Sequence, residues 1–389
     1  MDLDAFQWLL TDEGQRLLST ATDAPEDPLK AGAALRRSAS AEHVAAALTQ
    51  VTLRRRAVPK FGDLAERMYF TPDGLEQATR LSVATHRAAR LAAGETESVI
   101  DLGCSIGGDL VAFARAGITS VGVDLDPVRV AVATANLAAL DVGGAVSVAD
   151  ATALDTSPFD VAFADPARRS ARGRTFNVDD WTPPWPFVSG LLGRASCVKV
   201  APGIPHDLIP DGVEGEWVSD HGEVKEAALW SSWLATTARR ATVIGDGGLA
   251  TITSEDDPGG AAVSAWGRFL YEPDGAVIRA GLVTAVSAGV KGWLLDQHIA
   301  YVGSDEPFRT PFARTYEVIE ELPYREKALR AALRERAIGR LTIKKRGVNV
   351  VPDELRKRLS LAGDNEATIV LTRAEDKGIC LLVRPLART

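Results

Sequence analysis

The amino-acid sequence predicts an α/β protein with a Rossmann-like, doubly wound sheet, an N-terminal helical segment and a small C-terminal α+β domain. Short runs of valine, isoleucine and alanine, such as "SVIDL" and "SVGVD", alternate with helical stretches between residues 98 and 165. These runs are apolar throughout, as strands of a parallel sheet covered on both faces require. A glycine turn, "GCSIGG", joins the first run directly to a helix, so a ligand is expected at the carboxyl ends of the strands.

The composition is that of a globular protein, because 46% of the 389 residues are hydrophobic and 25% are charged. No apolar run is long enough to cross a bilayer, and the start, "MDLDAFQWLL", lacks the basic region of a signal peptide. Cys104, Cys197 and Cys380 are too scattered for a metal knuckle or a disulfide framework, which fits a reducing cytoplasm. The histidines form no H-x-x-x-H pair. We therefore expect a cytoplasmic protein with neither a metal site nor a membrane partner.

Helical periodicity dominates the first part of the chain. Helices are predicted over "DAFQWLLTDEGQRLLSTA", after Asp27 and after Ser40. Another, "LEQATRLSVATHRAARLAAG", follows a turn and ends at Gly94. The composition of "TSEDDPGGAAVSAWG" is that of a linker. The predicted domains are a helical segment at 1–70, an α/β domain at 71–255 and an α+β domain at 256–389.

Strands and helices can be placed in both later domains. In the α/β domain, further strands are predicted in "AVSVAD", "DVAFADP", "ASCVKVAP", "EVKEAALWSS" and "RATVIG", and helices in "GDLVAFARAG" and "PVRVAVATANLAAL". In the last domain, helices are predicted in "REKALRAALRERAIG" and "PDELRKRLSLAG", and strands in "RLTIKKRG" and "EATIVLTRAEDKGICLLVRP".

The charge is uneven along the chain. Residues 316–389 contain 16 basic and 11 acidic residues, a net of +5, although the whole chain has a net charge of −8. The remainder therefore carries −13. A basic end on an acidic body suggests a phosphate-bearing partner for that end.

The glycine loop at residues 103–107 fits three kinds of site. It is a literal G-x-S-x-G centred on Ser105, the pattern of a hydrolase nucleophile elbow, but no HGGG-type segment precedes it. A dinucleotide site needs glycine in the middle, and Asp101 and Asp109 would then face a diphosphate. Each close pair of anions costs roughly 4 kcal/mol at an effective dielectric constant of 20. The hydrolase interpretation also leaves Asp101, Asp124 and Asp165 without a role.

The third kind of site uses these acidic residues. S-adenosylmethionine has no phosphate, but it has an ammonium, a ribose diol and an adenine. Carboxylates at the ends of three successive predicted strands suit these groups: Asp101 the ammonium, Asp124 the ribose hydroxyls and Asp150 the adenine amino group. Ser105 is then a small residue that allows close approach. The predicted donor-binding residues are Asp101, Gly103, Ser105, Gly107, Asp124 and Asp150.

The stretch "VIDLGCSIGGDLVAFARAGITSVGVDLDPVRVAVATANLAAL" resembles class I S-adenosylmethionine-dependent methyltransferases. Its G-C-x-I-G-G variant followed by "VDLDPVRVA" is most similar to the trimethylguanosine-synthase-like branch, whose members methylate the exocyclic amine of guanine in RNA. Ser105 stands where that branch usually has glycine. "YFTPDGLEQATRLSVATHRA" resembles the helix that closes the donor pocket there, and "GRLTIKKRGVNVVPDELRKRLSLAGDNEATIVLTR" resembles a THUMP-like domain. The resemblance spans most of residues 60–389 and implies a methyltransferase that uses S-adenosylmethionine.

The fourth predicted strand ends in "FADPARRSARGR". Amino-methyltransferases have [D/N]-P-P-aromatic here, and this chain keeps Asp165 and Pro166 but has Ala167 and Arg168 in place of the last two. Asp165 is predicted to orient an acceptor amine and to take its proton, with Pro166 beside it.

The residues expected to bind the substrate lie in three places. Trp181 or Trp185 could stack on a base in place of the missing aromatic residue, because both lie in the proline-rich "NVDDWTPPWPF". Arg168 begins a basic loop with three further arginines, and the last domain carries a basic cluster. The predicted substrate-binding residues are Arg168, Trp181, Trp185, Lys344, Lys345 and Arg346. The predicted function is methyl transfer to a base nitrogen of RNA. A serine hydrolase using Ser105 and a non-catalytic RNA-binding protein remain the alternatives.

Overall fold

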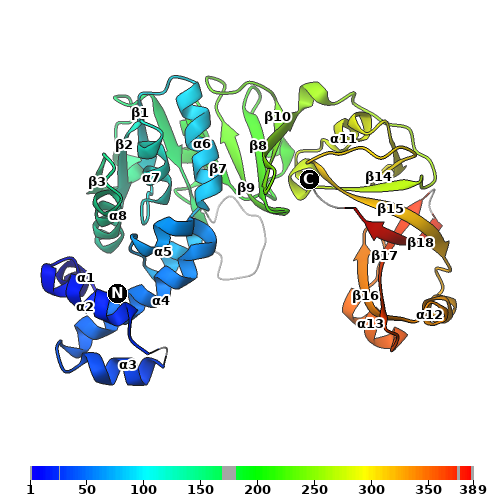
Figure 1. The fold of residues 1–389 in the computed structure, drawn as a ribbon. Helices are drawn as coiled ribbons and strands as arrows, with labels where there is room; N and C mark the ends of the chain where they lie inside the picture. The colour runs from blue at the N-terminus through cyan, green and yellow to red at the C-terminus, as the bar shows by residue number, and fades with distance from the viewer. Residues whose placement is uncertain (1, 26, 169–180, 375–376, 387–389) are drawn as a thin grey trace. The chain divides into compact units, whose positions relative to one another are not determined.

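The N-terminal part of the chain is helical, as predicted (Figure 1). The computed structural model describes residues 2–25, 27–168, 181–374 and 377–386. The first helices are α1 (Leu3–Leu9), α2 (Asp12–Thr22), α3 (Pro28–Leu35), α4 (Ala41–Phe61), α5 (Pro72–Gln77) and α6 (Leu81–Ala93), with a 3-10 turn η1 at Gly62–Glu66. Asp27 and Ser40 accept hydrogen bonds from backbone N–H groups of the first turns of α3 and α4. The two helix starts predicted there are confirmed.

A nine-stranded sheet follows, with the strand order β11-β10-β8-β9-β7-β4-β1-β2-β3. Its strands are β1 (Ser98–Leu102), β2 (Thr119–Asp124), β3 (Ala145–Val148), β4 (Val161–Ala164), β7 (Ser196–Val200), β8 (Glu214–Asp220), β9 (Glu223–Trp230), β10 (Arg239–Gly245) and β11 (Gly248–Thr253). The helices α7 (Gly108–Arg115), α8 (Pro127–Ala139) and α9 (Trp185–Leu191) and the 3-10 turns η2 (Ala151–Ala153) and η4 (His206–Leu208) lie between them. The predicted Rossmann-like fold class is confirmed.

The strand order reverses between β1 and β4. Strands β1, β2 and β3 pair in parallel in one direction, and β1, β4 and β7 pair in parallel in the other. The chain therefore continues from β1 to β2 on one side of β1 and later returns to β4 on the other side. In sheets of this kind, a crevice for ligands forms at the carboxyl ends of the two strands where the order reverses, here β1 and β4. This reversal brings together the predicted site residues that follow β1, β2 and β4.

The N-terminal helices share a hydrophobic core with the helices of the sheet. Phe6, Phe61 and Phe70 pack in one buried cluster with Leu110 of α7 and Val132 of α8. By contact, the chain divides into two units, Met1–Val213 with Ala228–Ala235, and Glu214–Ala227 with Thr236–Thr389. The boundaries predicted at 70 and 255 remain predictions.

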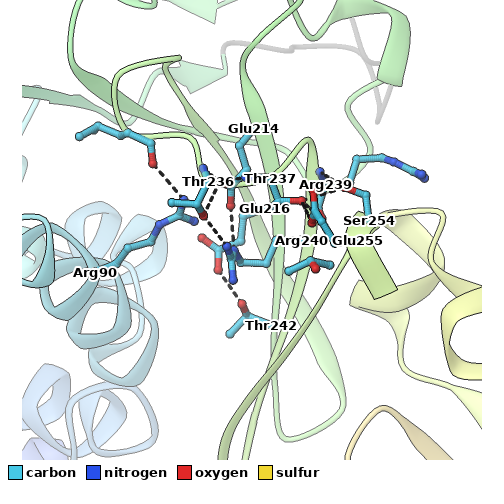
Figure 2. A network of polar contacts seen from close by, with 12 residues as sticks. Arg90, Glu214, Glu216, Thr236, Thr237, Arg239, Arg240, Thr242, Ser254 and Glu255 are labelled. Atoms are coloured by element: carbon cyan, nitrogen blue, oxygen red, sulfur yellow. Dashed lines mark hydrogen bonds and ion pairs between the residues drawn. The ribbon is translucent and has the colours of Figure 1, made fainter. Parts of the chain in front are cut away.

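Strand β8, "EGEWVSD", was not predicted, because its glutamates interrupt the apolar pattern although all seven residues are buried. Figure 2 shows how these glutamates are paired. Glu214 accepts hydrogen bonds from the Thr236 N–H at 2.8 Å and from Arg240 Nε at 2.8 Å. Glu216 accepts one from Thr242 Oγ1 at 2.5 Å. These bonds join β8 to β10 and its preceding turn inside one unit.

Arg240→Met is expected to lower the free energy of unfolding by about 3–5 kcal/mol, because it removes a cation from a fully buried carboxylate. Urea unfolding followed by circular dichroism measures the change. Arg340→Met, at an arginine with 81% of its side chain exposed, is the matched control and should stay within about 0.5 kcal/mol of the unaltered chain. Equal stability of the two variants would contradict the role given to Arg240.

The second unit contains a seven-stranded sheet with the order β13-β14-β12-β15-β18-β17-β16. Its strands are β12 (Phe269–Pro273), β13 (Trp293–Asp296), β14 (Ile299–Ser304), β15 (Ala313–Leu322), β16 (Ile338–Lys345), β17 (Asn365–Ala374) and β18 (Lys377–Pro385), and its helices are α10 (Gly275–Arg279), α11 (Val283–Gly289), α12 (Glu326–Glu335) and α13 (Pro352–Leu359). The α+β character, both later helices and β16–β18 agree with the prediction, whereas β15 was not assigned as a strand. The elements between residues 268 and 312 were missed, since each is short, and Val263 in the predicted linker forms a bridge with Leu294.

Candidate active site

The loop between β1 and α7 turns through three residues with positive φ: Gly103 at 101°, Ser105 at 50° and Gly107 at 78°. The N–H of Gly103 donates to the Val123 carbonyl at 2.9 Å, so the loop is attached to the end of β2. A Cβ at Gly107 would lie 3.1 Å from the Cβ of Ala133. Glycine adopts these conformations without steric cost. Ser105 adopts one too, in the left-handed region that favours glycine.

Ser105 lacks the surroundings of a nucleophile. Its backbone N–H donates to Asp124 Oδ2 at 3.0 Å, and its hydroxyl is buried without a hydrogen-bond partner among the described residues. All five histidines of the chain are described, and none contacts this hydroxyl. Activation of a serine needs a base within hydrogen-bond reach. The geometry therefore gives the hydrolase alternative no support.

Ser105→Ala is expected to change the dissociation constant for S-adenosylmethionine by no more than a few-fold, because the backbone N–H that contacts Asp124 stays. Asp124→Ala is expected to abolish binding, since it removes the predicted ribose ligand and frees the loop. Isothermal titration calorimetry measures both. Labelling of Ser105 by a fluorophosphonate probe would contradict this account and restore the hydrolase alternative.

Asp101, at the end of β1, is 1% exposed, and its Oδ1 has no hydrogen-bond partner among the described residues. Burial raises the pKa of this carboxyl well above its ordinary value, and the nearby Asp109 and Asp165 raise the pKa further. Asp165 is therefore close enough to interact with Asp101. Burial of a carboxyl oxygen without a hydrogen-bond partner costs free energy of folding unless a ligand supplies a hydrogen-bond donor. The ammonium of S-adenosylmethionine is such a donor.

Asp124 and Asp150 have different environments. Asp124 is 8% exposed, and its Oδ1 accepts from the Asp126 N–H at 2.9 Å, while Oδ2 accepts from Ser105. Each carboxylate oxygen can accept a second bond, which leaves capacity for a ribose diol. Asp150 is exposed, and its Oδ1 accepts from the Thr152 hydroxyl at 2.7 Å and from the Thr152 N–H at 2.9 Å. These two hydrogen bonds lower the pKa of Asp150. Leu125, which was not predicted as a site residue, has an apolar side chain that is 65% exposed beside Asp124 and suits the face of an adenine.

Asp109, in the first turn of α7, is used inside the protein. It forms a buried ion pair with Arg87 of α6, whose guanidinium also lies 4.6 Å from the centre of the Phe163 ring. The pair neutralises one of the carboxylates near the glycine loop at residues 103–107, which is predicted to bind the methyl donor and is called the donor loop below. Sequence reasoning missed Arg87, although an arginine in the apolar stripe of a helix was the available signal.

Asp165 lies beside a lysine that sequence reasoning also missed. Strands β4 and β7 pair in register at Ala164 and Val198, so the next residues, Asp165 and Lys199, are neighbours. Lys199 Nζ donates to Asp165 Oδ2 at 2.6 Å and to the hydroxyl of Thr79 at 3.1 Å. Pro166 is buried. The end of β4 thus presents a carboxylate–ammonium pair next to the donor residues.

The segment before α6 packs on the donor loop. A Cβ at Gly74 of α5 would lie 2.4 Å from Ile106 in that loop, so only glycine allows this approach. Lys60 of α4 donates to the carbonyls of Leu75, Glu76 and Ala78 at 2.7–2.9 Å, at the end of α5.

A buried amide fixes the same segment from the other side. Asn136 of α8 donates to the carbonyls of Tyr69 and Ile106, at 3.0 and 2.8 Å. It also accepts from the Tyr69 N–H at 2.6 Å. The N-terminal segment is therefore attached to the loop predicted to bind the donor.

The predicted substrate residues near β4 are partly described. Arg168 lies in β5 (Ala167–Arg168), whose backbone pairs with β6 (Trp181–Thr182) in the register Arg168↔Trp181. Trp185 is the first residue of α9 and is partly buried. Arg169, Arg172 and Arg174 lie outside the described residues.

The basic cluster after β16 is not uniform. Lys344 Nζ lies 3.2 Å and Arg346 Nη2 lies 4.0 Å from the Glu272 carboxylate of β12, which also accepts from the Tyr316 hydroxyl at 2.9 Å. The guanidinium of Arg346 lies 5.4 Å from the centre of the Tyr301 ring, in the same unit. Lys345 is exposed. Two of the three predicted phosphate contacts are therefore already engaged with an acidic residue.

The donor site and the strand order together define a Rossmann-like methyltransferase. Two proteins of Mycobacterium tuberculosis, from strains CDC 1551 / Oshkosh and ATCC 25618 / H37Rv, are similar; each is named an uncharacterized S-adenosylmethionine-dependent methyltransferase. Each is 40% identical over 332 residues, covering 82% of this chain and 90% of the relative. The chain belongs to the S-adenosylmethionine-dependent methyltransferases. It is an enzyme, and S-adenosylmethionine is its methyl donor.

Other comparisons concern the fold and the ends of the chain. A THUMP domain-like family matches residues 313–385, and a domain of unknown function (DUF8688) matches residues 2–57. A structure from Porphyromonas gingivalis W83, provisionally described as a methyltransferase, shares the fold with a TM-score of 0.75 and 21% identity, covering 99% of this chain and 98% of that one. The similarity therefore extends over both sheets.

The residues present fit S-adenosylmethionine. Among the described residues, no hydrogen-bond donor reaches the buried Oδ1 of Asp101. Asp124 is fixed by two backbone N–H groups, and Leu125 offers an apolar surface. None of the described helices combines the length and apolar character that crossing a bilayer demands. Nowhere in the described ranges do three His, Cys, Asp or Glu side chains gather so as to hold a metal ion.

Proposed function

We propose that the acceptor is a nitrogen of an RNA base and that Asp165 orients it. The observation that carries the proposal is the position of the Asp165 carboxylate: Asp165 directly follows β4, which pairs with β1 in the register Leu102↔Ala164, so it lies beside the end of β1. The THUMP domain-like match and the resemblance of the donor loop to the trimethylguanosine-synthase-like branch support RNA as the substrate class. The three cysteines are buried free thiols, which supports the cytoplasm as the compartment.

The chemistry asks the protein mainly for orientation. When bound, S-adenosylmethionine supplies an electrophilic methyl group: the acceptor lone pair forms the N–C bond, the S–C electron pair goes to sulfur, and the acceptor nitrogen loses a proton. Good orientation of reacting groups supplies roughly 7–11 kcal/mol. Among the described residues, Asp165 Oδ1 makes no hydrogen bond, whereas Oδ2 accepts from Lys199. Oδ1 is therefore assigned to accept the acceptor N–H and then its proton, and Pro166 limits the freedom of the backbone beside it.

Tritium transfer from labelled S-adenosylmethionine tests the substrate class. Total RNA and total protein from a strain that lacks this gene are offered separately as acceptors. We expect tritium in the RNA fraction, sensitive to ribonuclease. Label in protein alone would overturn the proposal.

Lys345→Gln is expected to reduce the salt dependence of RNA binding, because this lysine of the basic cluster is exposed. For single-stranded RNA, the slope of log affinity against log salt should fall by about 0.7 for one lost phosphate contact. Fluorescence anisotropy at several salt concentrations measures the slope.

Lys344→Gln should instead lower the melting temperature, since it removes a partner of Glu272. Lys30→Gln, at another exposed lysine, is the control for both the slope and the melting temperature. An unchanged slope for Lys345→Gln would place RNA recognition elsewhere.

A further inference from the structure

We infer that Lys199, fixed by Thr79 in the connection between α5 and α6, is a positioning residue for the acceptor, and that it makes the site select an electrically neutral nitrogen over a protonated alkyl amine. The inference rests on the proposed function, because it concerns the same carboxylate of Asp165. It goes further by assigning a role to Lys199 and to the segment that precedes α6.

Lys199 is placed where it can fix the carboxylate of Asp165. Its Nζ lies 2.6 Å from Asp165 Oδ2, with 15% of the lysine side chain and 32% of the aspartate side chain exposed. A hydrogen bond between charged groups in this half-buried setting is short and directional, so it fixes the rotation of the carboxylate. Oδ1 of Asp165 then keeps one orientation toward the acceptor.

Lys199 is in turn anchored by Thr79. The Thr79 hydroxyl is buried and accepts from Lys199 Nζ at 3.1 Å. Thr79 lies between α5 and α6, and α5 packs on the donor loop through Gly74 and is capped by Lys60. The connection between α5 and α6 therefore contributes a side chain to the acceptor side of the site.

The carboxylates near the donor and acceptor sides differ in how their charge is compensated. Asp109 is paired with Arg87, and Asp101 is assigned to the ammonium of the methyl donor. Arg129 lies 4.0 Å from Asp124 and 3.7 Å from Asp126, so these two carboxylates share one cation. Lys199 compensates Asp165, so the carboxylate on the acceptor side is already paired with a cation. An ammonium approaching Asp165 would also meet the ammonium of Lys199 at close range, and like charges at this distance repel. The amine of a nucleobase is neutral at physiological pH and meets no such repulsion.

The test uses the full chain bound to S-adenosylhomocysteine and saturation-transfer NMR with two probes, guanosine and Nα-acetyl-lysine methylamide. We expect saturation transfer to guanosine and little to the lysine derivative in the unaltered protein. Lys199→Met should lose the guanosine signal and gain the lysine signal, and Lys199→Arg should restore the original preference. Thr79→Val should weaken the guanosine signal, whereas Thr79→Ser should retain it. Lys30→Met is the control.

Kinetics with RNA add a second readout. Lys199→Met is expected to lower kcat about 10- to 100-fold with little change in the affinity for S-adenosylmethionine, and Lys199→Arg to recover most of kcat. A structural role alone would lower the melting temperature and the donor affinity together. Probe preferences that do not change in Lys199→Met, or no guanosine signal in the unaltered protein, would overturn the inference. Lys199-dependent guanosine binding without tritium in RNA would remove only the RNA assignment.

Discussion

Asp101→Asn is expected to weaken binding of S-adenosylmethionine by about 2–5 kcal/mol, ~30-fold or more, and to make the ligand-free protein more stable. The affinity falls because a neutral amide cannot compensate the donor ammonium. The stability rises because the variant removes a buried carboxylate whose Oδ1 has no hydrogen-bond partner among the described residues. Calorimetry and thermal unfolding measure the two effects on the same preparations.

The pH dependence of this pair of effects follows from the raised pKa of Asp101. Below the ordinary pKa of an aspartate the carboxyl is neutral in both the folded and the unfolded states, and its stabilising contribution is complete. As the pH rises above that ordinary pKa, the unfolded chain loses the proton while the folded chain keeps it, so this stabilising contribution decreases. It is completely lost once the pH has passed the raised pKa of the folded state. The stability advantage of Asp101→Asn should therefore be largest at high pH and shrink as the pH falls.

Donor binding should show the opposite dependence on pH. The ammonium of S-adenosylmethionine needs the ionised carboxylate, so affinity should increase as the pH rises through the folded pKa of Asp101. Below that pKa, binding should release a proton, which is seen as a binding enthalpy that varies with the ionisation enthalpy of the buffer. Asp101→Asn should lose this variation. A buffer-independent enthalpy throughout the pH range would contradict the assignment of Asp101.

Asp165→Ala is expected to retain binding of S-adenosylmethionine and to lose turnover about 100-fold or more. General acid–base groups contribute on this scale, and Asp165 is assigned to the acceptor rather than to the donor. Asp165→Asn should keep the shape of the site and the contact with Lys199 but not the proton acceptance. It should therefore lose kcat as well, with a smaller change in KM than Asp165→Ala.

Donor affinity measured by calorimetry serves as the control for both variants. Near-normal RNA methylation by Asp165→Ala would remove this residue from the mechanism. Loss of donor binding in Asp165→Asn would instead show that the residue belongs to the donor side of the site.

The sheet around the donor loop was predictable because its signals are local. Each of β1, β2 and β4 is a mainly apolar run with an acidic residue at or next to its end, and parallel strands bring these ends to one edge. Strand β8 could not be predicted from the same rule, because Glu214 and Glu216 are buried only through partners on other segments. A pattern of polarity does not show which polar groups will be paired.

The acceptor side was less predictable for the same reason. A lysine in the apolar run "SCVKV" was a visible signal, but its partner depends on β7 lying next to β4. Thr79 meets it only because α5 packs on the donor loop. In the second unit, Lys344 and Arg346 counted as free charges in the sequence, whereas Glu272, about seventy residues earlier, lies between them in the structure.

Mass spectrometry of nucleosides from RNA tests the central claim most directly. RNA is prepared from the parent strain, from a strain lacking the gene, and from that strain complemented with the unaltered chain or with Asp165→Ala. We predict one nucleoside with a methyl group on a base nitrogen that is present in the parent strain and absent from the strain lacking the gene. It should return only when the unaltered chain is supplied. Identical nucleoside profiles in all four strains, or restoration by Asp165→Ala, would contradict this prediction.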